Sequence, residues 1–457
     1  LTFSEYEQIS DYEAEMYRYN NYQYEVRFLR AYFYFNLVRQ YGDVPFTDHV
    51  LSTTEVNTLT RKPAQEVFDW IIKECDEIKD LIIPDYNNLG ALVPSGESAE
   101  TGRANKRTVL ALKARTALYA ASPLFNSHQE GSQGYKELWY RAAKANKELI
   151  ETCEDAGMRL IDDYENLWDA KSYSIAIDEL IFGCRAIRAT NSFEKYNFPV
   201  GLENCRGGNC PTQTLVDAYE LKDSGERPDK KADYDKNKPY YEGRDPRFEK
   251  TIAKNGDTKW PNWNETALET YQGGANAEPL SGGTPTGYYL KKYCQTSINT
   301  TTAKPTTDNH TWIIYRLGEF YLNYAEALFK YLGTAYATNN EFPIPANEMV
   351  SKTRWRTKVN MPKFPAGLDN KLWWEKYQNE RMVELAFEGH RFWDVRRWKE
   401  GDKHFSSIDE MKIYKSGDSY SYRRVTVNRQ WDDKMYFFPI PQSEKAKNPN
   451  LTQNPGW

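Results

Sequence analysis

The sequence predicts a mostly α-helical protein in which an irregular lobe is inserted between two blocks of helices. Apolar residues recur with helical periodicity over residues 25–153 and again over residues 312–399. Residues 190–310, between these blocks, lose that periodicity and contain several glycine pairs and prolines. Because a structureless loop of this length is rare in a compact protein, we expect short helices, hairpins and turns there.

The first helix, expected over residues 25–41, carries aromatic and leucine side chains on more than one face. Leu29, Phe33 and Leu37 follow one another at four-residue spacing and therefore share one face. Phe28 lies on another face, which leaves little of the helix polar. Such a helix is typical of a layered all-α core, so we expect all four side chains to be buried.

Apolar spacing predicts further helices in both blocks. The first block should continue with helices at residues 64–80, 106–121 and 137–153, and the second should contain helices at residues 312–331, 343–357, 371–386 and 388–399. Alanines recur through the 106–121 segment, and their small side chains favour close approach of neighbouring helices.

The 312–331 segment matches part of a tetratricopeptide repeat, in which pairs of helices stack on one another. Tyr324 and Leu328 on this segment should then be buried. The match is weak by itself, since the spacings are looser than in a regular repeat. The matching L-G-x-x-Y…A positions are Leu317, Gly318, Tyr321 and Ala325.

Residues 380–398 concentrate acids and arginines at helical spacing and allow two interpretations. The carboxylates could serve acid–base chemistry. Alternatively, acids and arginines three or four residues apart could form a partly buried lattice of ion pairs. So many arginines beside the acids favour the lattice. We therefore expect Glu384, Arg391 and Asp394 to pair within the protein, away from any ligand cleft.

Aromatic residues in the lobe do not follow the spacing of a buried helix or strand. Trp260, Trp263, Tyr271 and Tyr289 lie among asparagine, glycine and threonine. One interpretation is a satellite hydrophobic cluster beneath a long loop. The other is an exposed surface on which sugar rings stack, with amides nearby to bind their hydroxyl groups.

Composition narrows the classes of partner. The net charge of −5 argues against a nucleic-acid or anionic-membrane partner. No apolar run is long enough to span a bilayer. Cys205 and Cys210 flank a short RGGN segment, where either a disulfide or a zinc site could form. No histidine lies near them, which disfavours zinc.

Catalytic signatures are missing from the sequence. It contains no G-x-S-x-G, H-E-x-x-H or Walker motif, and its five histidines are scattered. We therefore expect no catalytic residues, metal ligands or cofactor. A glycoside hydrolase needs only two carboxylates at a suitable separation, so that alternative stays open.

Several segments along the chain together form a recognisable set. They are FLRAYFYFNLVRQYGDVPF (28–46), GRANKRTVLALKARTALYAASPLFN (102–126), LVDAYELKDSGERP (215–228), GRDPRFEKTI (243–252), IIYRLGEFYLNYAEAL (313–328), ERMVELAFEGHRFWDVRRW (380–398) and FFPIPQSEKAKNPNLTQNPGW (437–457). The last two, in this order at the C-terminus, are the most specific pair. This set of segments resembles the RagB/SusD family of outer-membrane nutrient-binding proteins.

The resemblance implies a single SusD-like domain over residues 1–457, with a tetratricopeptide-like scaffold of four helix pairs and a C-terminal family segment at 437–457. It also implies glycan binding without turnover, on the extracellular face of the outer membrane, for import by a SusC-like TonB-dependent transporter. Family members carry a lipidated cysteine after a signal peptide, so the sequence, which begins in a short acidic, tyrosine-rich segment, is read as a mature or trimmed form. RagB-like members handle peptides, which is the main alternative ligand class.

The resemblance further implies where the ligand lies. In the family, the loop after the first YGDVPF-type turn meets the irregular lobe on one face. For this chain, the loop is residues 46–60, and its polar residues Asp48, His49 and Asn57 are expected near the lobe aromatics. The resulting candidate ligand-binding set is Trp260, Trp263, Tyr271, Tyr289, Asp48, His49 and Asn57.

Overall fold

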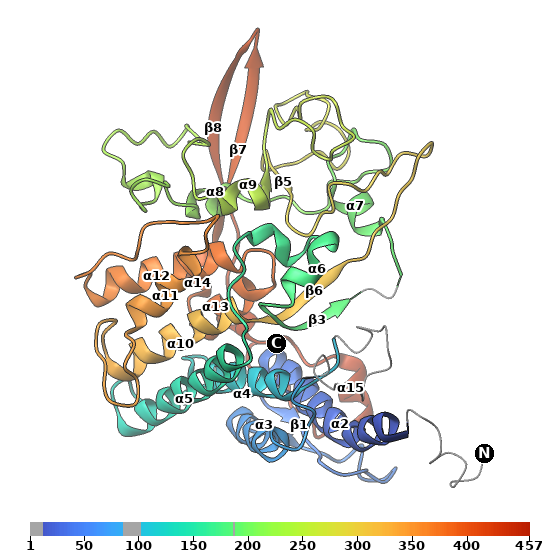
Figure 1. Cartoon of the computed structure of the whole chain (residues 1–457), viewed down its shortest axis with the longest axis vertical. Helices are drawn as coiled ribbons and strands as arrows, with labels where there is room; N and C mark the ends of the chain where they lie inside the picture. The colour runs from blue at the N-terminus through green and yellow to red at the C-terminus, as the bar shows by residue number, and fades with distance from the viewer. Residues whose placement is uncertain (1–11, 86–101, 186–187) are drawn as a thin grey trace.

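The computed structural model describes residues 12–85, 102–185 and 188–457. The chain is mostly helical, as the sequence predicts (Figure 1). The described helices are α2 (Tyr12–Tyr41), α3 (Ala64–Ile78), α4 (Lys106–Ala121), α5 (Gln133–Asp155), α6 (Tyr173–Ala176), α7 (Ser192–Asn197), α8 (Gln213–Ala218), α9 (Arg247–Thr251), α10 (Leu317–Leu332), α11 (Ala346–Arg354), α12 (Asn370–Glu384), α13 (His390–Arg397), α14 (Gly401–Phe405) and α15 (Gln442–Lys447).

The described strands form four separate two-stranded antiparallel sheets. None of these sheets is large enough to serve as a core, so the helices carry the architecture. The paired strands are β1 (Val44–Pro45) with β2 (Arg61–Lys62), β3 (Leu180–Arg185) with β6 (Thr311–Arg316), β4 (Ile252–Ala253) with β5 (Tyr289–Leu290), and β7 (Ser407–Ser416) with β8 (Ser419–Asn428).

The two helical blocks join into one continuous scaffold. Helix α2 packs on α3, α3 on α4 and α4 on α5, so sequence neighbours are also neighbours in space. Helix α10, which follows the lobe in sequence, packs directly on α5 and then on α11. Figure 1 shows these helices in the lower and middle parts of the molecule, with the lobe above them. This stacking of successive helices is the expected tetratricopeptide-like arrangement.

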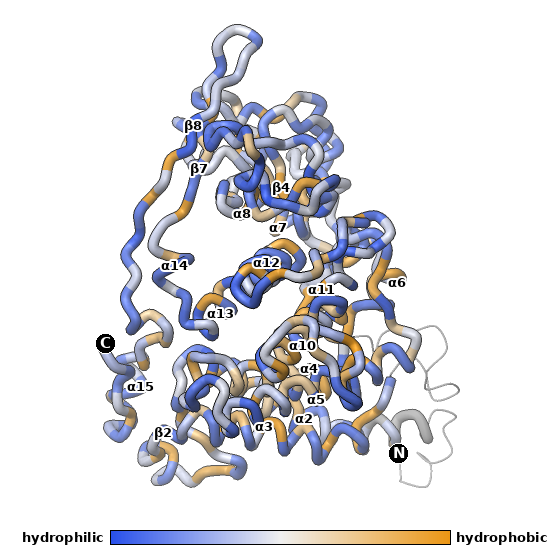
Figure 2. The backbone as a smooth tube through the Cα atoms, turned by 90° about the vertical axis from the view of Figure 1, so that its left-hand side faces the viewer, coloured by the Kyte–Doolittle hydropathy of each residue, from blue (hydrophilic) through white to orange (hydrophobic). Residues whose placement is uncertain are grey.

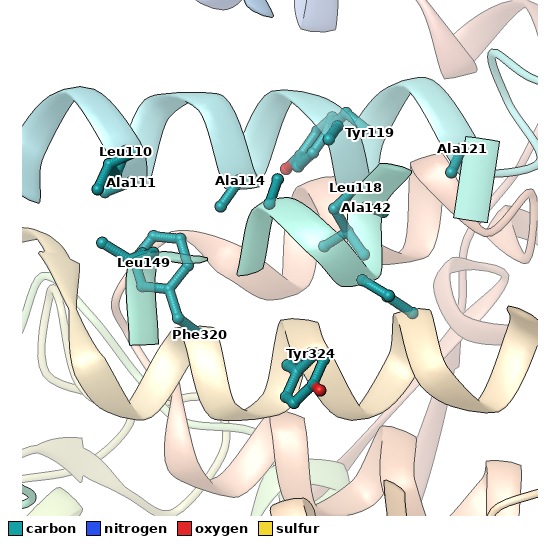
Figure 3. Packing of buried hydrophobic residues seen from close by; sticks show 14 of the residues in the cluster. Leu110, Ala111, Ala114, Leu118, Tyr119, Ala121, Ala142, Leu149, Phe320 and Tyr324 are labelled. Carbon is teal, nitrogen blue, oxygen red and sulfur yellow. The ribbon is translucent and has the colours of Figure 1, made fainter. Parts of the chain in front are cut away.

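The core between α4, α5 and α10 depends on small side chains (Figure 3). Ala114 on α4 and Ala142 on α5 are fully buried and let the helices approach closely. Phe320 and Tyr324 of α10 fill the layer below them. Tyr324 and Leu328 are both buried, which confirms that prediction.

The predicted 312–331 helix is wrong over its first turn. Residues up to Arg316 form strand β6, which pairs with β3, and α10 begins at Leu317. The sequence TWIIYR is rich in aromatic and β-branched residues that favour a strand. The partner strand lies more than a hundred residues upstream, so helical periodicity could not reveal it.

Helix α2 buries only one of its two apolar faces. Phe28 is fully buried, as predicted. The prediction is wrong for Leu29, Phe33 and Leu37, whose exposed fractions are 39%, 60% and 40%. The face that packs against the scaffold instead contains Phe28, Ala31, Phe35 and Val38.

The lobe contains the short helices expected for residues 190–310, namely α7, α8 and α9. Its strands β4 and β5 pair with each other but are remote in sequence, so they do not form a hairpin. The β7–β8 hairpin also packs against the lobe, although it belongs to the C-terminal part of the chain. It was not predicted from the sequence. Met411 and Ile413 of β7 are buried beside Tyr288 of the lobe. Beyond this anchored base, the hairpin projects upward from the molecule in Figures 1 and 2.

Candidate functional site

Two of the predicted lobe aromatics lie in the hydrophobic interior of the lobe. Trp260 is 5% exposed and packs edge-on against Phe198, with ring centroids 5.4 Å apart. Tyr289 is fully buried, and its hydroxyl donates to the Asn276 carbonyl oxygen at 2.7 Å. Neither ring presents a face to solvent, so neither can stack on an external ligand. For these two residues the satellite-cluster interpretation is correct.

The other two predicted aromatics keep partial exposure. Trp263 is half-buried, and its indole N–H donates to the Ile298 carbonyl oxygen at 2.8 Å. Tyr271 packs beside Tyr420 of the β7–β8 hairpin, with ring centroids 5.9 Å apart. The Lys415 ammonium lies 5.1 Å from the centre of the Tyr271 ring. Tyr271 therefore belongs to a small aromatic surface at the side of the hairpin.

The structure does not bring the 46–60 loop to the lobe. Asp48, His49 and Asn57 are exposed, and His49 Nδ1 lies 3.1 Å from Asp48 Oδ1. Strands β1 and β2, which flank this loop, lie at the bottom of Figures 1 and 2, whereas the lobe lies at the top. The stacked scaffold helices separate them, so the expected joint site is not formed.

A polar pocket of about 550 Å³ lies in the lobe around α7. Tyr196 of α7 is 55% exposed and provides an aromatic wall. This combination of an accessible aromatic ring with short polar neighbours in a hollow is typical of a saccharide site. We call it the Tyr196 pocket. Its lining residues are Ser192, Lys195, Tyr196, Asn204, Cys205 and Arg206.

Local backbone structure holds the two sides of the Tyr196 pocket together. The Gly208 N–H donates to the Tyr196 carbonyl oxygen at 2.7 Å, and the Gly207 N–H donates to the Phe198 carbonyl oxygen at 2.9 Å. A Cβ at Gly208 would lie 2.3 Å from the Tyr196 ring, so only glycine permits this approach. The side-chain amide of Asn204 donates to the Thr300 carbonyl oxygen at 2.9 Å, which ties the pocket loop to residue 300.

Sequence analysis did not identify Tyr196, because a tyrosine three residues after Phe193 resembles one face of a helix. The nearest signal in the sequence is the RGGN segment, which by itself indicates only a disulfide or a zinc site. In the structure, Cys205 and Cys210 are free thiols. Burial raises the pKa of both thiols. Among the described residues, no group of three or more potential ligands is placed to hold a metal ion.

The charged C-terminal helices form the predicted ion-pair lattice. Glu384 is fully buried and accepts hydrogen bonds from Arg247 at 2.7 Å, Arg316 at 2.7 Å and Arg356 at 2.8 Å. Arg247 comes from α9 of the lobe, whereas Arg316 precedes α10 of the scaffold. The lattice therefore fixes the lobe to the scaffold.

Asp394 also pairs as predicted, but Arg391 does not join it. Asp394 binds Arg381 at 2.6 Å and Arg397 at 2.9 Å. The Arg391 guanidinium instead lies 3.1 Å from His404 Nδ1. Most pairs thus connect different elements rather than neighbours on one helix, because the buried helices face one another.

The electrostatics of this lattice oppose acid catalysis. Burial by itself would raise the pKa of Glu380, but the charges of Arg247 and Arg354 outweigh it and lower the pKa to about 2. In the same way, surrounding arginines hold the pKa of Glu384 well below its usual range despite burial. A general acid at neutral pH needs a carboxyl group whose pKa is raised.

A second hollow, of about 600 Å³, is lined by the exposed face of α2. Helix α2 lies in the lower part of the molecule in Figure 1. The C-terminal segment forms its other wall and is fastened to the end of α2. The Phe438 N–H donates to the Gln40 carbonyl oxygen at 2.8 Å, and the Asn454 amide donates to the Tyr41 carbonyl oxygen at 3.0 Å. We call this hollow the α2 groove. Its apolar lining includes Val26, Leu29, Phe33, Leu37, Pro45, Ile440, Pro441 and Leu451.

Fold and surface together define a helical-scaffold protein with an inserted lobe that carries a polar pocket. Comparison with known families gives the same class. A SusD family profile matches residues 179–457, and a profile described as starch-binding and associating with the outer membrane matches residues 5–118. The chain belongs to the SusD family. Membership places it among carbohydrate-binding proteins that associate with the outer membrane.

Individual relatives cover nearly the whole chain. The SusD-like protein P2 of Formosa agariphila is 24% identical over 441 residues, 94% of this chain and 73% of the relative. A SusD-like protein of Bacteroides fragilis has a similar crystal structure, with a TM-score of 0.76 and 27% identity, over 96% of this chain and 80% of that one. A laminarin-binding SusD-like protein shares the fold at a TM-score of 0.61 and 20% identity, over 96% and 80% of the two chains.

No described helix is both long and apolar enough to cross a bilayer.

Proposed function

We propose that this protein captures an oligosaccharide or polysaccharide at the extracellular face of the outer membrane, without chemical turnover. It then delivers the ligand to a SusC-like TonB-dependent transporter, and a lipid at the N-terminus anchors it. The observation that carries the binding role is the Tyr196 pocket, in a chain that belongs to a carbohydrate-binding family.

The chemistry of the Tyr196 pocket suits a sugar ring. A pyranose presents apolar C–H groups on its faces and hydroxyl groups around its rim. The exposed Tyr196 ring can stack on a face. Ser192 and Asn204 are exposed at the same pocket and can exchange hydrogen bonds with rim hydroxyls. Trp263 and Tyr271 remain secondary candidates, because each residue is only half-buried.

Replacing Tyr196 with alanine should weaken glycan binding by about 1–3 kcal/mol, because it removes the stacking surface at the centre of the pocket. Tyr196→Phe should bind nearly as well as the wild type, since it keeps the ring. Affinity electrophoresis on a panel of plant, host and microbial polysaccharides would first identify a ligand, and calorimetry would then compare the variants.

Tyr271→Ala is the matched comparison on the other aromatic surface of the lobe. If this variant loses binding while Tyr196→Ala keeps it, the ligand site lies beside the hairpin. Binding assays with a panel of peptides, run in parallel, would detect the alternative that this protein binds peptides, as RagB-like members do. Analysis of the recovered glycan for shorter products would detect hydrolysis.

The α2 groove suits the transporter better than the ligand. Both of its walls come from segments that carry the family resemblance, residues 28–46 and 437–457. A surface built from family-wide segments fits a family-wide partner, whereas ligands differ between members. Its lining is largely apolar, and exposed apolar patches of this kind mark protein contacts. We assign the groove to an apolar extracellular loop of the SusC-like transporter.

Phe33→Asp should reduce co-purification of the transporter by about tenfold or more, because it places a charge in the centre of the apolar contact. The measurement uses tagged protein from detergent-solubilised outer membranes, with the transporter identified by mass spectrometry. Val50→Asp is the matched control, since Val50 is almost fully exposed and lies outside the groove. If equal amounts of transporter co-purify with both variants, the groove is not part of the interface. Binding at the Tyr196 pocket should not change in either.

A further inference from the structure

The Tyr196 pocket carries two positive charges that the described part of the protein does not neutralise. Lys195 precedes Tyr196 on α7, and Arg206 lies on the loop that forms the facing wall. Neither side chain forms an ion pair or a hydrogen bond with any residue in the described ranges. Several other lysines of the lobe are neutralised by acids. Lys254 and Lys291, for example, both bind Asp257 at 2.7 Å.

The acids adjacent to the pocket residues are engaged elsewhere. Glu194 is fully buried and lies 2.9 Å from His310 Nε2, and it also accepts from the Gln295 N–H at 2.9 Å. Glu203 accepts from the Thr302 N–H at 2.8 Å. No acid lines the pocket. The lining of the pocket therefore carries two cationic side chains and no acidic one, in a chain whose net charge is −5.

We propose that the Tyr196 pocket selects acidic saccharides, in which a sugar ring stacks on Tyr196 while its carboxylate or sulfate group binds Arg206 and Lys195. This inference rests on the proposed function of the pocket as the glycan site. A guanidinium group binds a carboxylate or sulfate through two parallel hydrogen bonds, which a neutral hydroxyl cannot match. Because Arg206 is exposed, the attraction is screened by salt, and the preference for acidic ligands should fall as ionic strength rises.

The test compares charged polysaccharides with neutral counterparts of the same backbone. One pair is a polyuronate and its carboxyl-reduced product, and the other is a sulfated polysaccharide and its desulfated product. Each polymer is tested against the wild type, the Tyr196→Ala variant, and a double variant that combines Lys195→Gln with Arg206→Gln. The control double variant is Lys236→Gln with Lys238→Gln, which removes two charges from another exposed loop of the lobe.

We expect the wild type to bind one charged polymer about tenfold or more tightly than its neutral counterpart. The pair that shows this preference identifies the group as carboxylate or sulfate. The Lys195/Arg206 double variant should lose the preference, while the control double variant should keep it. If neutral polymers bind equally well through Tyr196, and the double variant matches the wild type, the charge inference is wrong and the glycan site stands. If no polymer shows binding that depends on Tyr196, the proposed function of the pocket fails.

Discussion

Glu384→Gln should lower the free energy of unfolding by about 3–5 kcal/mol, because it leaves three buried guanidinium groups without their shared negative charge. Glu384 accepts hydrogen bonds from Arg247, Arg316 and Arg356, all of which are buried with it. Glutamine keeps the shape but supplies only one acceptor oxygen and no charge. Urea unfolding at neutral pH, followed by circular dichroism, measures the change.

The control for this variant is Glu137→Gln on the exposed side of α5, which should leave the free energy of unfolding within about 0.5 kcal/mol of the wild type. Glycan affinity should be unchanged in both variants, because Glu384 lies in the buried lattice and not in the Tyr196 pocket. Unchanged stability combined with lost binding would reverse this assignment and make the buried carboxylates part of the ligand site.

Two phenylalanines on the same helix should lose very different amounts of stability on truncation to alanine. Phe28→Ala should cost about 3–5 kcal/mol, since Phe28 is fully buried and packs edge-on against Phe182, with ring centroids 5.7 Å apart. Phe33→Ala should cost about 1 kcal/mol or less, because Phe33 is 60% exposed and leaves no enclosed cavity. Chemical denaturation of both variants under identical conditions gives the comparison.

The comparison tests the orientation of α2 directly. Equal losses for both variants would mean that the outer face of the helix is covered in the isolated protein. A larger loss for Phe33→Ala would mean that the helix is rotated about its axis. In either case the α2 groove could not be an open docking surface.

Most helices of the scaffold could be predicted from the sequence, because helical periodicity is a local property of the chain. The expected 106–121 helix is α4 with the same bounds, and the expected 371–386 helix overlaps α12 closely. Strand β6 could not be predicted in this way, since its partner β3 is remote in sequence. The strands of the β7–β8 hairpin pair locally, but apolar spacing did not predict it, because its side chains are exposed or half-buried except for Met411 and Ile413 of β7.

For the candidate site, the sequence predicted the type of side chain but not its position in the chain. An exposed tyrosine among short polar residues was the expected anchor, and Tyr196 fits that description. The particular residues were wrong in part, because Trp260 and Tyr289 have the same polar and glycine-rich neighbours in sequence yet fill the interior of the lobe. The resemblance implied that the 46–60 loop, with Asp48, His49 and Asn57, lies near the lobe. The flanking strands β1 and β2 instead lie at the other end of the molecule, beyond the stacked helices.

The sequence by itself determined the family, the helical blocks and the buried pairing of the charged C-terminal helices. These properties depend on residue type and short-range spacing, which the chain carries in any conformation. Only the tertiary structure decided which apolar face of α2 is open and which aromatic ring of the lobe reaches solvent. Leu29 and Phe28 are equally apolar, and only the position of α3, α4 and the C-terminal segment distinguishes them. Burial is a property of the neighbours that folding brings together, and adjacent residues on one helix can differ in it completely.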